Sequence, residues 1–198
     1  MTRQQNVDIL LRVADGIRYA HSRGLVHRDI KPENVMLGRY GEVLLADWGL
    51  AVNLHRVEPE QDFQQSIGGT PAYMAPELAS GFHSDIVRQS DVYLLGATLF
   101  QILTGFPPHD GDTLLNCIAN AANNRIRHTT LESELMDVAR RAMQTDPADR
   151  FENVAQFIDA IRTHRQHEQS NLLMQRARER VKQSDGSDTY RDLSLIHI

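Results

Sequence analysis

Two short stretches of the sequence carry side chains that suit phosphoryl-transfer chemistry. The first is His27-Arg28-Asp29-Ile30-Lys31-Pro32-Glu33-Asn34, which places a carboxylate, an ammonium and an amide at fixed offsets. The second is Asp47-Trp48-Gly49, which adds another carboxylate. Two carboxylates and an amide beside one phosphate site would bind Mg²⁺ and orient a hydroxyl group. Either aspartate in isolation would more often be a turn or cap residue, so the interpretation depends on their joint spacing.

A predicted helix precedes the first stretch. Apolar residues recur at helical spacing over about residues 5–22, and Gly24 follows where a helix often ends in a left-handed residue. Pro32 keeps the first stretch itself from being helical. Two short apolar runs at residues 35–37 and 43–46 then predict a hairpin, which would hold the two stretches side by side.

The sequence beyond this hairpin predicts a loop and then a set of helices. Residues 52–66 are polar and follow neither helical nor strand spacing, which predicts a mobile loop. Ser90 or Asp91 would cap a buried helix over residues 91–104, which ends at Gly105. Apolar residues at helical spacing predict three further helices, at residues 114–122, 131–142 and 154–161.

Composition predicts one globular domain, because 41% of the 198 residues are apolar and 24% are charged. We expect this domain over residues 1–163, an exposed helical extension over 164–183, and a disordered linker with an artefactual tail over 184–198. The net charge of −5 argues against a nucleic-acid surface. The single cysteine and the lack of an apolar membrane-spanning or signal segment predict a cytoplasmic chain.

In combination, the motifs resemble the C-terminal lobe of a eukaryotic-type protein kinase over about residues 5–163. They are HRDIKPEN, DWG, GTPAYMAPE and SDVYLLG in this order, followed by Arg150. Lys31 and the GTPAYMAPE motif resemble the serine/threonine branch. The longer sequence of residues 21–51 is most similar to bacterial members. The resemblance implies a mainly α lobe with a small β-hairpin, which transfers the γ-phosphoryl group of ATP to Ser/Thr hydroxyls of protein substrates.

Catalytic roles follow from this resemblance for five residues. Asp29 would accept the substrate hydroxyl proton, and Lys31 would place a charge on the transferring phosphoryl group. Asn34 and Asp47 would bind Mg²⁺ ions. Thr70 would contact both Asp29 and Lys31.

The resemblance also implies nucleotide contacts and scaffold residues. Besides Lys31, Asn34 and Asp47, the nucleotide would contact Glu33 and Met36, although a Met in a hairpin is also ordinary core filler. His27, Trp48 and Asp91 match a stacked column behind the active site, and Glu77 and Arg150 match a buried ion pair. Trp48 departs from the commoner Phe, which puts the packing of this column in question.

Arg28 next to Asp29 resembles the branch in which phosphorylation of the activation loop orders the site through an arginine–phosphate pair. Ser66 is the candidate phosphate acceptor. The alternative is that Ser66 is simply a polar loop residue.

The family also needs a glycine-rich loop, a strand lysine and a helix glutamate, and the sequence contains no GxGxxG motif. We therefore expect half of a two-lobed enzyme, with the N-terminal lobe missing. Either the chain is a fragment of an active kinase, or it is a non-catalytic scaffold or binding module. Retention of Asp29, Lys31, Asn34 and Asp47 favours the fragment. In similar bacterial kinases the region after His164 leads to further segments, which would anchor a full-length protein in a membrane.

Overall fold

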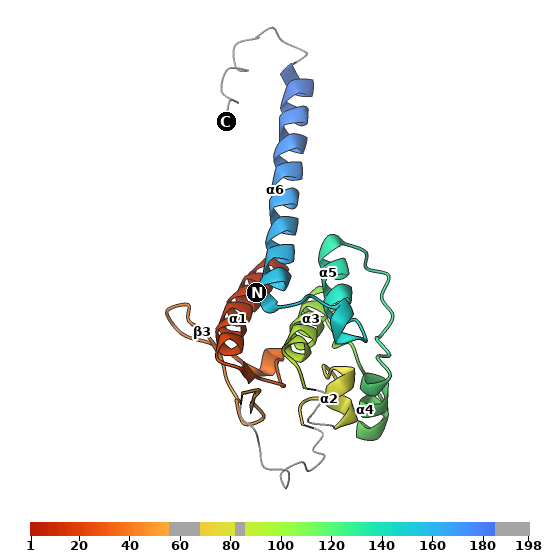
Figure 1. The fold of residues 1–198 in the computed structure, drawn as a ribbon. Helices are drawn as coiled ribbons and strands as arrows, with labels where there is room; N and C mark the ends of the chain where they lie inside the picture. Colours follow the sequence, from red (N-terminus) through yellow and green to blue (C-terminus); the bar gives the residue numbers. More distant parts are fainter. Residues whose placement is uncertain (56–67, 82–85, 185–198) are drawn as a thin grey trace. The chain divides into compact units, whose positions relative to one another are not determined.

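The computed structural model describes residues 1–55, 68–81 and 86–184. The chain divides into one compact unit over Met1–Ile161 and a second that begins at Arg162. The first unit is mainly helical, as the sequence predicts, with two small β-sheets (Figure 1). Within the described ranges, no helix combines the length and the hydropathy needed to cross a bilayer.

Helix α1 (Arg3–Ser22) begins with a reciprocal cap. The Gln5 N–H donates to the Thr2 hydroxyl and the Thr2 N–H donates to the Gln5 side chain, which satisfies two amides at the helix start. One face of α1 is buried and ends with His21. Gly24 follows at a φ of 78°, a left-handed conformation that glycine adopts without strain.

A short strand after α1 differs from the sequence prediction. β1 (Leu25–Val26) pairs antiparallel with β4 (Val52–Asn53), so the start of the predicted 52–66 loop belongs to a sheet. A two-residue strand is too short to show an alternating pattern, which explains the wrong prediction. The candidate acceptor Ser66 lies outside the described residues.

The predicted hairpin is present between the two chemical stretches. A 3₁₀ turn, η1 (Pro32–Asn34), leads into β2 (Val35–Leu37), which pairs antiparallel with β3 (Val43–Leu45). The Ala46 N–H donates to the carbonyl of Asn34 at 2.8 Å, which extends the pairing beyond both strands. The hairpin therefore brings the end of the first stretch next to the beginning of the second.

Helix α3 (Arg88–Thr104) is the centre of the hydrophobic core. It lies beside α1 (Arg3–Ser22) and α5 (Glu134–Ala142) in Figure 1, and α2 (Pro76–Ser80) lies beside α4 (Leu114–Ala122). The predicted cap of α3 was wrong, because the helix begins three residues before Asp91. Ser90 instead accepts a hydrogen bond from the Val87 N–H, and the Asp91 side chain is turned inward.

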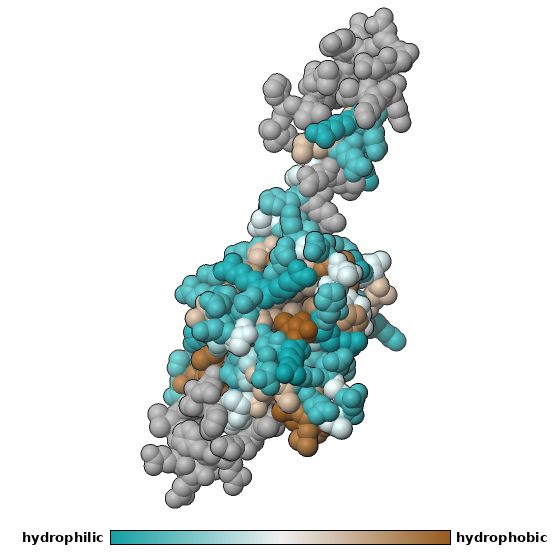
Figure 2. Space-filling view, turned by 90° about the vertical axis from the view of Figure 1, so that its right-hand side faces the viewer, coloured by the Kyte–Doolittle hydropathy of each residue, from teal (hydrophilic) through white to brown (hydrophobic). Residues whose placement is uncertain are grey.

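Three further helices and a 3₁₀ turn follow along the chain. Thr113 caps α4 and Ser133 caps α5, each by accepting a backbone N–H with its hydroxyl. After the 3₁₀ turn η4 (Pro147–Asp149), α6 runs without a break over Val154–Ser184, where the sequence suggested two successive helices. Figure 2 shows that apolar residues form separate patches on an otherwise hydrophilic face.

Candidate active site

Asp91 from α3 holds the first stretch in place. Its carboxylate accepts the backbone N–H groups of His27 and Arg28, each at 2.9 Å, and the Nε2 atom of His21 lies 2.8 Å away. The Asp91 side chain is fully buried, so these three contacts replace water around the carboxylate. They also stabilise Arg28 at a φ of 72°, a conformation that a non-glycine residue adopts only when its surroundings enforce it.

His27 connects the first stretch to the end of the hairpin. Its Nδ1 accepts the Asp29 N–H at 3.2 Å, so Nε2 carries the proton and donates to the Ala46 carbonyl at 3.2 Å. Burial lowers the pKa of His27, although the charge of Asp91 opposes this effect, and the neutral ring fits both contacts. Trp48 makes an edge contact with the ring at 4.6 Å between centroids, but its own side chain stays partly exposed.

Asp29 is the centre of a polar cluster that also contains Lys31, Asn34 and Thr70. The Thr70 hydroxyl donates to Asp29 Oδ1 at 2.8 Å. Lys31 Nζ lies 2.9 Å from Asp29 Oδ2 and donates to the Thr70 hydroxyl as well. Asn34 Nδ2 donates to the Asp29 carbonyl at 2.7 Å and to Oδ2 at 3.1 Å. These contacts bring the first stretch and Thr70 together in one cluster.

The cluster keeps Asp29 ionised. Burial alone would raise its pKa, but hydrogen bonds from Lys31, Thr70 and Asn34, together with the Lys31 charge, lower the pKa below its ordinary value. A buried carboxylate that stays negative at neutral pH is a strong hydrogen-bond acceptor. Asp29 can therefore orient a hydroxyl group that reaches it.

Asn34 and Asp47 meet the requirements for cation ligands. Both hydrogen bonds of the Asn34 amide use Nδ2, which leaves Oδ1 as its ligand atom. Asp47 lies at the far end of the hairpin with an exposed carboxylate and a φ of 61°. Among the described residues, no group of three His, Cys, Asp or Glu side chains forms an all-protein metal cage. This donor set fits Mg²⁺, which is commonly bound by one or two protein oxygens plus phosphates and water.

Glu77 and Arg150 form a buried bidentate ion pair. Arg150 Nη1 and Nη2 lie 2.6 and 2.8 Å from the two Glu77 carboxylate oxygens. The other three guanidinium N–H groups donate to the carbonyls of Gln144, Gln89 and Thr145. All five donors are therefore satisfied, and the pair fixes α2 to the segment before α6.

The side chain of Arg28 lies against the second stretch. Its Nη1 reaches the Leu50 carbonyl at 3.4 Å, and its buried Nε has no hydrogen-bond partner among the residues that the structure describes. Burial lowers its pKa, against the charge of Asp91. A pairing with Ser66 falls outside the described part of the chain.

Of the residues predicted to contact a nucleotide, Met36 lies on the exposed side of the hairpin, whereas Asn34 is buried and Lys31 is half-buried. Met36 is 58% exposed, and Leu37 and Leu44 beside it are similarly accessible. Glu33 is also exposed and acts electrostatically on Tyr73, whose pKa is raised to about 12, chiefly by burial. The hairpin thus presents an apolar surface next to the polar cluster.

The contribution of His21 was not predicted from the sequence, in which it lies near the end of the predicted helix over residues 5–22. In the structure His21 contacts Asp91 from α1 and so helps to hold the first stretch. A polar side chain at the end of the apolar face of this helix was the available signal. The contact between Tyr93 and His109 was also not predicted. Both residues are buried, and the Arg150 guanidinium lies over the Tyr93 ring.

Comparisons with known proteins agree with this geometry. A family model described as "Protein kinase domain" matches residues 1–181. The serine/threonine-protein kinase PknD of Chlamydia muridarum is 32% identical over 79% of this chain and 19% of its own length. STK11 of Gallus gallus is 33% identical over 82% of the chain and 37% of its own length, and PknB of Mycobacterium tuberculosis is 29% identical over 83% and 27%. The chain therefore spans between about a fifth and two fifths of the length of these relatives.

Proposed function

Because the chain belongs to the protein kinase family, we propose that it is the C-terminal, substrate-side lobe of a serine/threonine protein kinase. The observation that carries this proposal is the cluster in which Asp29 accepts hydrogen bonds from Lys31, Asn34 and Thr70. A binding module has no chemical need for this arrangement. The cluster therefore favours catalysis over the alternative of a non-catalytic scaffold.

Asp29 acts on the substrate hydroxyl. The carboxylate accepts the hydroxyl hydrogen bond and orients the oxygen for attack, and it takes the proton late in the transfer. Its lowered pKa suits this role, because the acceptor is already ionised when substrate arrives. The proton passes from the Ser or Thr oxygen to Asp29.

Lys31 and Thr70 control the electrostatics and geometry around Asp29. The Lys31 ammonium stabilises negative charge on the transferring group, and it is held by both Asp29 and the Thr70 hydroxyl. Thr70 comes from the segment after the predicted loop over residues 52–66. Its contact therefore makes the catalytic cluster depend on the position of that segment.

Asn34 and Asp47 would hold Mg²⁺, with Glu33, Lys31 and Met36 on the nucleotide side of the site. Mg-ATP, when bound, supplies the phosphoryl group and neutralises charge that develops on it. Asn34 directly precedes β2, and Asp47 lies two residues beyond the end of β3. The hydrogen bond from the Ala46 N–H to the Asn34 carbonyl brings the two ligands into one region.

We also propose that this 198-residue chain forms only one wall of the nucleotide site. Met36, Leu37 and Leu44 are exposed, and a cavity of about 420 Å³ opens between α1, the hairpin and α3, lined in part by Ile9 and Ile102. Accessible apolar surface of this kind marks a place where further protein packs. The N-terminal lobe of a full-length enzyme would cover it. The chain alone should then bind Mg-ATP weakly and transfer no phosphate.

Binding of Mg-ATP and transfer of phosphate are tested separately. We expect Mg-ATP, added to the 198-residue chain, to shift the NMR signals of Asn34 and Met36, and Asp47→Asn to weaken this binding at least tenfold. Asp137→Asn, which changes an exposed carboxylate on α5, is the matched control and should bind as the parent does.

Two results would contradict these proposals. If Mg-ATP does not change the NMR signals, or if Asp47→Asn binds Mg-ATP as tightly as the parent, the proposed phosphoryl-transfer site is wrong. Efficient labelling of a basic protein with radioactive ATP would instead refute the one-wall proposal, because it would show a complete site.

A further inference from the structure

The later part of α6 carries a charge opposite to that of the rest of the chain. It begins the second unit at Arg162, and residues 162–184 contain six Arg or Lys residues and two Glu residues. Their net charge is +4 in a chain whose total is −5, so the remaining residues sum to −9. Such an asymmetry between two parts of one chain indicates an anionic partner for the basic part.

An apolar row runs along the exposed residues 173–180 of this helix. Leu173, Met174 and Ala177 share one face of α6, because Ala177 is four positions after the first and three after the second. The Leu173 and Met174 side chains are 65% and 56% exposed. These apolar side chains are therefore open to a partner.

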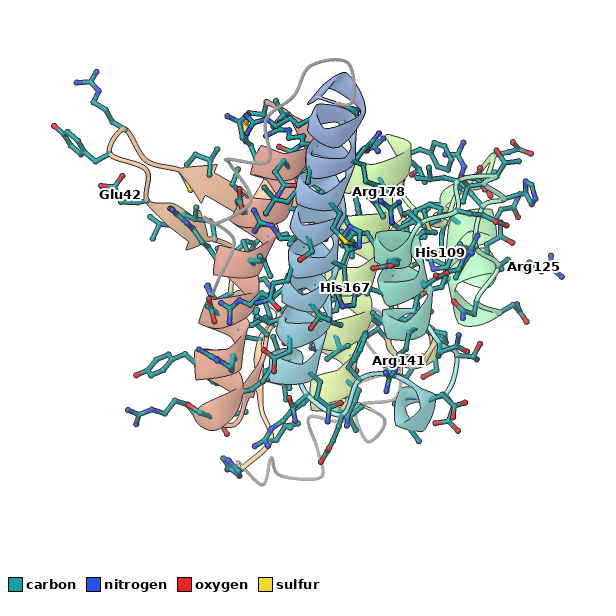
Figure 3. The ribbon with its side chains drawn as sticks, turned by 90° about the horizontal axis from the view of Figure 1, so that it is seen from above. Glu42, His109, Arg125, Arg141, His167 and Arg178 are labelled. Carbon is teal, nitrogen blue, oxygen red and sulfur yellow. The ribbon has the colours of Figure 1, made fainter. Side chains whose placement is uncertain are left out.

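Arginines border this apolar row on both sides. At about 100° per residue, Arg176 and Arg180 lie about 90° to one side of the row. Arg178, which Figure 3 labels on α6, lies about 90° to the other side. Gln175 and Glu179 occupy the opposite face. The acidic residue of this stretch is thus kept away from the face that the apolar row and the arginines share.

An anionic lipid surface fits this arrangement better than other anionic partners do. An amphipathic helix lies in the plane of a bilayer with its apolar row at the acyl boundary, while flanking arginines reach the lipid phosphates. Nucleic acid would pair with the arginines but leave the apolar row in water. A second copy of the helix would cover the apolar row but bring like charges together on both flanks.

We propose that residues 173–180 of α6 form an interfacial helix that binds membrane surfaces containing anionic lipids. The arginines supply attraction and the apolar row supplies burial, so each part strengthens the other. Because the apolar row is short, binding is reversible and weakens with salt. This inference does not depend on the proposed kinase activity.

The first experiment tests the charge. The 198-residue chain is sedimented with vesicles of phosphatidylcholine alone, or with a quarter of the lipid replaced by phosphatidylglycerol. We expect at least tenfold tighter binding to the mixed vesicles. Changing Arg176, Arg178 and Arg180 together to Gln should weaken this binding at least tenfold, since each arginine near such a surface contributes about fivefold. The same three positions changed to Lys should keep it.

The second experiment tests the apolar row and the location of binding. Leu173→Ser combined with Met174→Ser should weaken binding to the mixed vesicles at least tenfold, because both side chains lose their burial. Gln175→Ser on the opposite face, and Leu115→Ser at an exposed leucine on α4, are the controls and should bind as the parent does. The mixed vesicles should slow amide hydrogen exchange over residues 173–180 and leave the hairpin over residues 35–45 unchanged.

Several outcomes would overturn the proposal. Equal binding to neutral and mixed vesicles would remove the role of the arginines, and protection of the hairpin would move binding to another surface. Serine variants that bind like the parent, together with tighter binding to duplex DNA than to the vesicles, would assign the arginines to nucleic acid. Protection of residues 173–180 by raised protein concentration alone would assign the row to a second copy. No ATP is present, so a failure of the kinase proposal is seen separately.

Discussion

Arg150 shows at the scale of a single residue how a buried charge is made tolerable. Its guanidinium group donates all five hydrogens, two of them to Glu77 and three to backbone carbonyls, and its planar face lies 4.9 Å from the Tyr93 ring centre. Such a group is stable only as a complete set, because any lost partner leaves an unpaired buried charge. Asp91 follows the same rule with two backbone amides and His21.

The ion pair gives a prediction at this scale. Glu77→Gln removes the negative partner of Arg150 and should lower the free energy of unfolding by about 3–5 kcal/mol, measured by urea denaturation. Asp137→Asn removes the exposed partner of Arg140 at 3.6 Å on α5 and should cost less than about 1 kcal/mol. Equal losses in the two variants would contradict the importance of burial for this pair.

At the scale of elements, close packing decides where glycine is required. Gly96 lies on α3 where this helix meets α5, and a Cβ there would lie 2.6 Å from the Cβ of Ala142 and 3.2 Å from the Ala139 carbonyl. Neither neighbour is the flexible end of a side chain. Gly16, also in the middle of a helix, is exposed on α1, and no neighbouring atom lies within 4 Å of the position that a Cβ would take.

These two glycines should respond to the same change with opposite signs. Gly96→Ala should destabilise the chain by about 1–3 kcal/mol, because α3 and α5 would have to move apart. Gly16→Ala should stabilise it by about 0.5–1 kcal/mol through helix propensity alone. Thermal and urea unfolding of both variants would check this, and a stabilised Gly96→Ala would show that the α3–α5 contact is loose.

At the scale of the whole molecule, the apolar surface of the hairpin is the feature that most needs explanation. Met36, Leu37 and Leu44 are each more than half exposed beside the polar cluster around Asp29. Side chains of this kind normally face a partner surface or a ligand. In the proposed full-length enzyme, the nucleotide and the other lobe would cover them.

The chain by itself should therefore associate through the hairpin. We expect sedimentation velocity to show concentration-dependent association of the parent, and Leu44→Lys to reduce it strongly. Leu115→Lys, which changes a similarly exposed leucine on α4, serves as the control and should leave association unchanged. A stable monomer in the parent, or a greater effect of Leu115→Lys, would show that the hairpin is not the associating surface.

The sequence by itself determined the local parts of this protein. The apolar spacing of α1 and the two short runs of the hairpin are properties of neighbouring residues, so the helix and the hairpin were predicted nearly to their bounds. The order of the motifs was enough to indicate the protein kinase family, which the family comparison bears out. The start of α3 and the two-residue strand β4 were mistaken, because their local signals are weak.

Only the tertiary structure decided which distant residues meet. Asp91 is 64 residues from His27, and Arg150 is 73 residues from Glu77. Each contact depends on how α3 packs against its neighbours, which no local spacing specifies. The same holds for His21 and for His109, whose ring nitrogens meet the Tyr93 hydroxyl and the Arg125 carbonyl only in the packed chain. Burial and hydrogen-bond counts, which give these side chains their chemistry, are properties of the packed molecule.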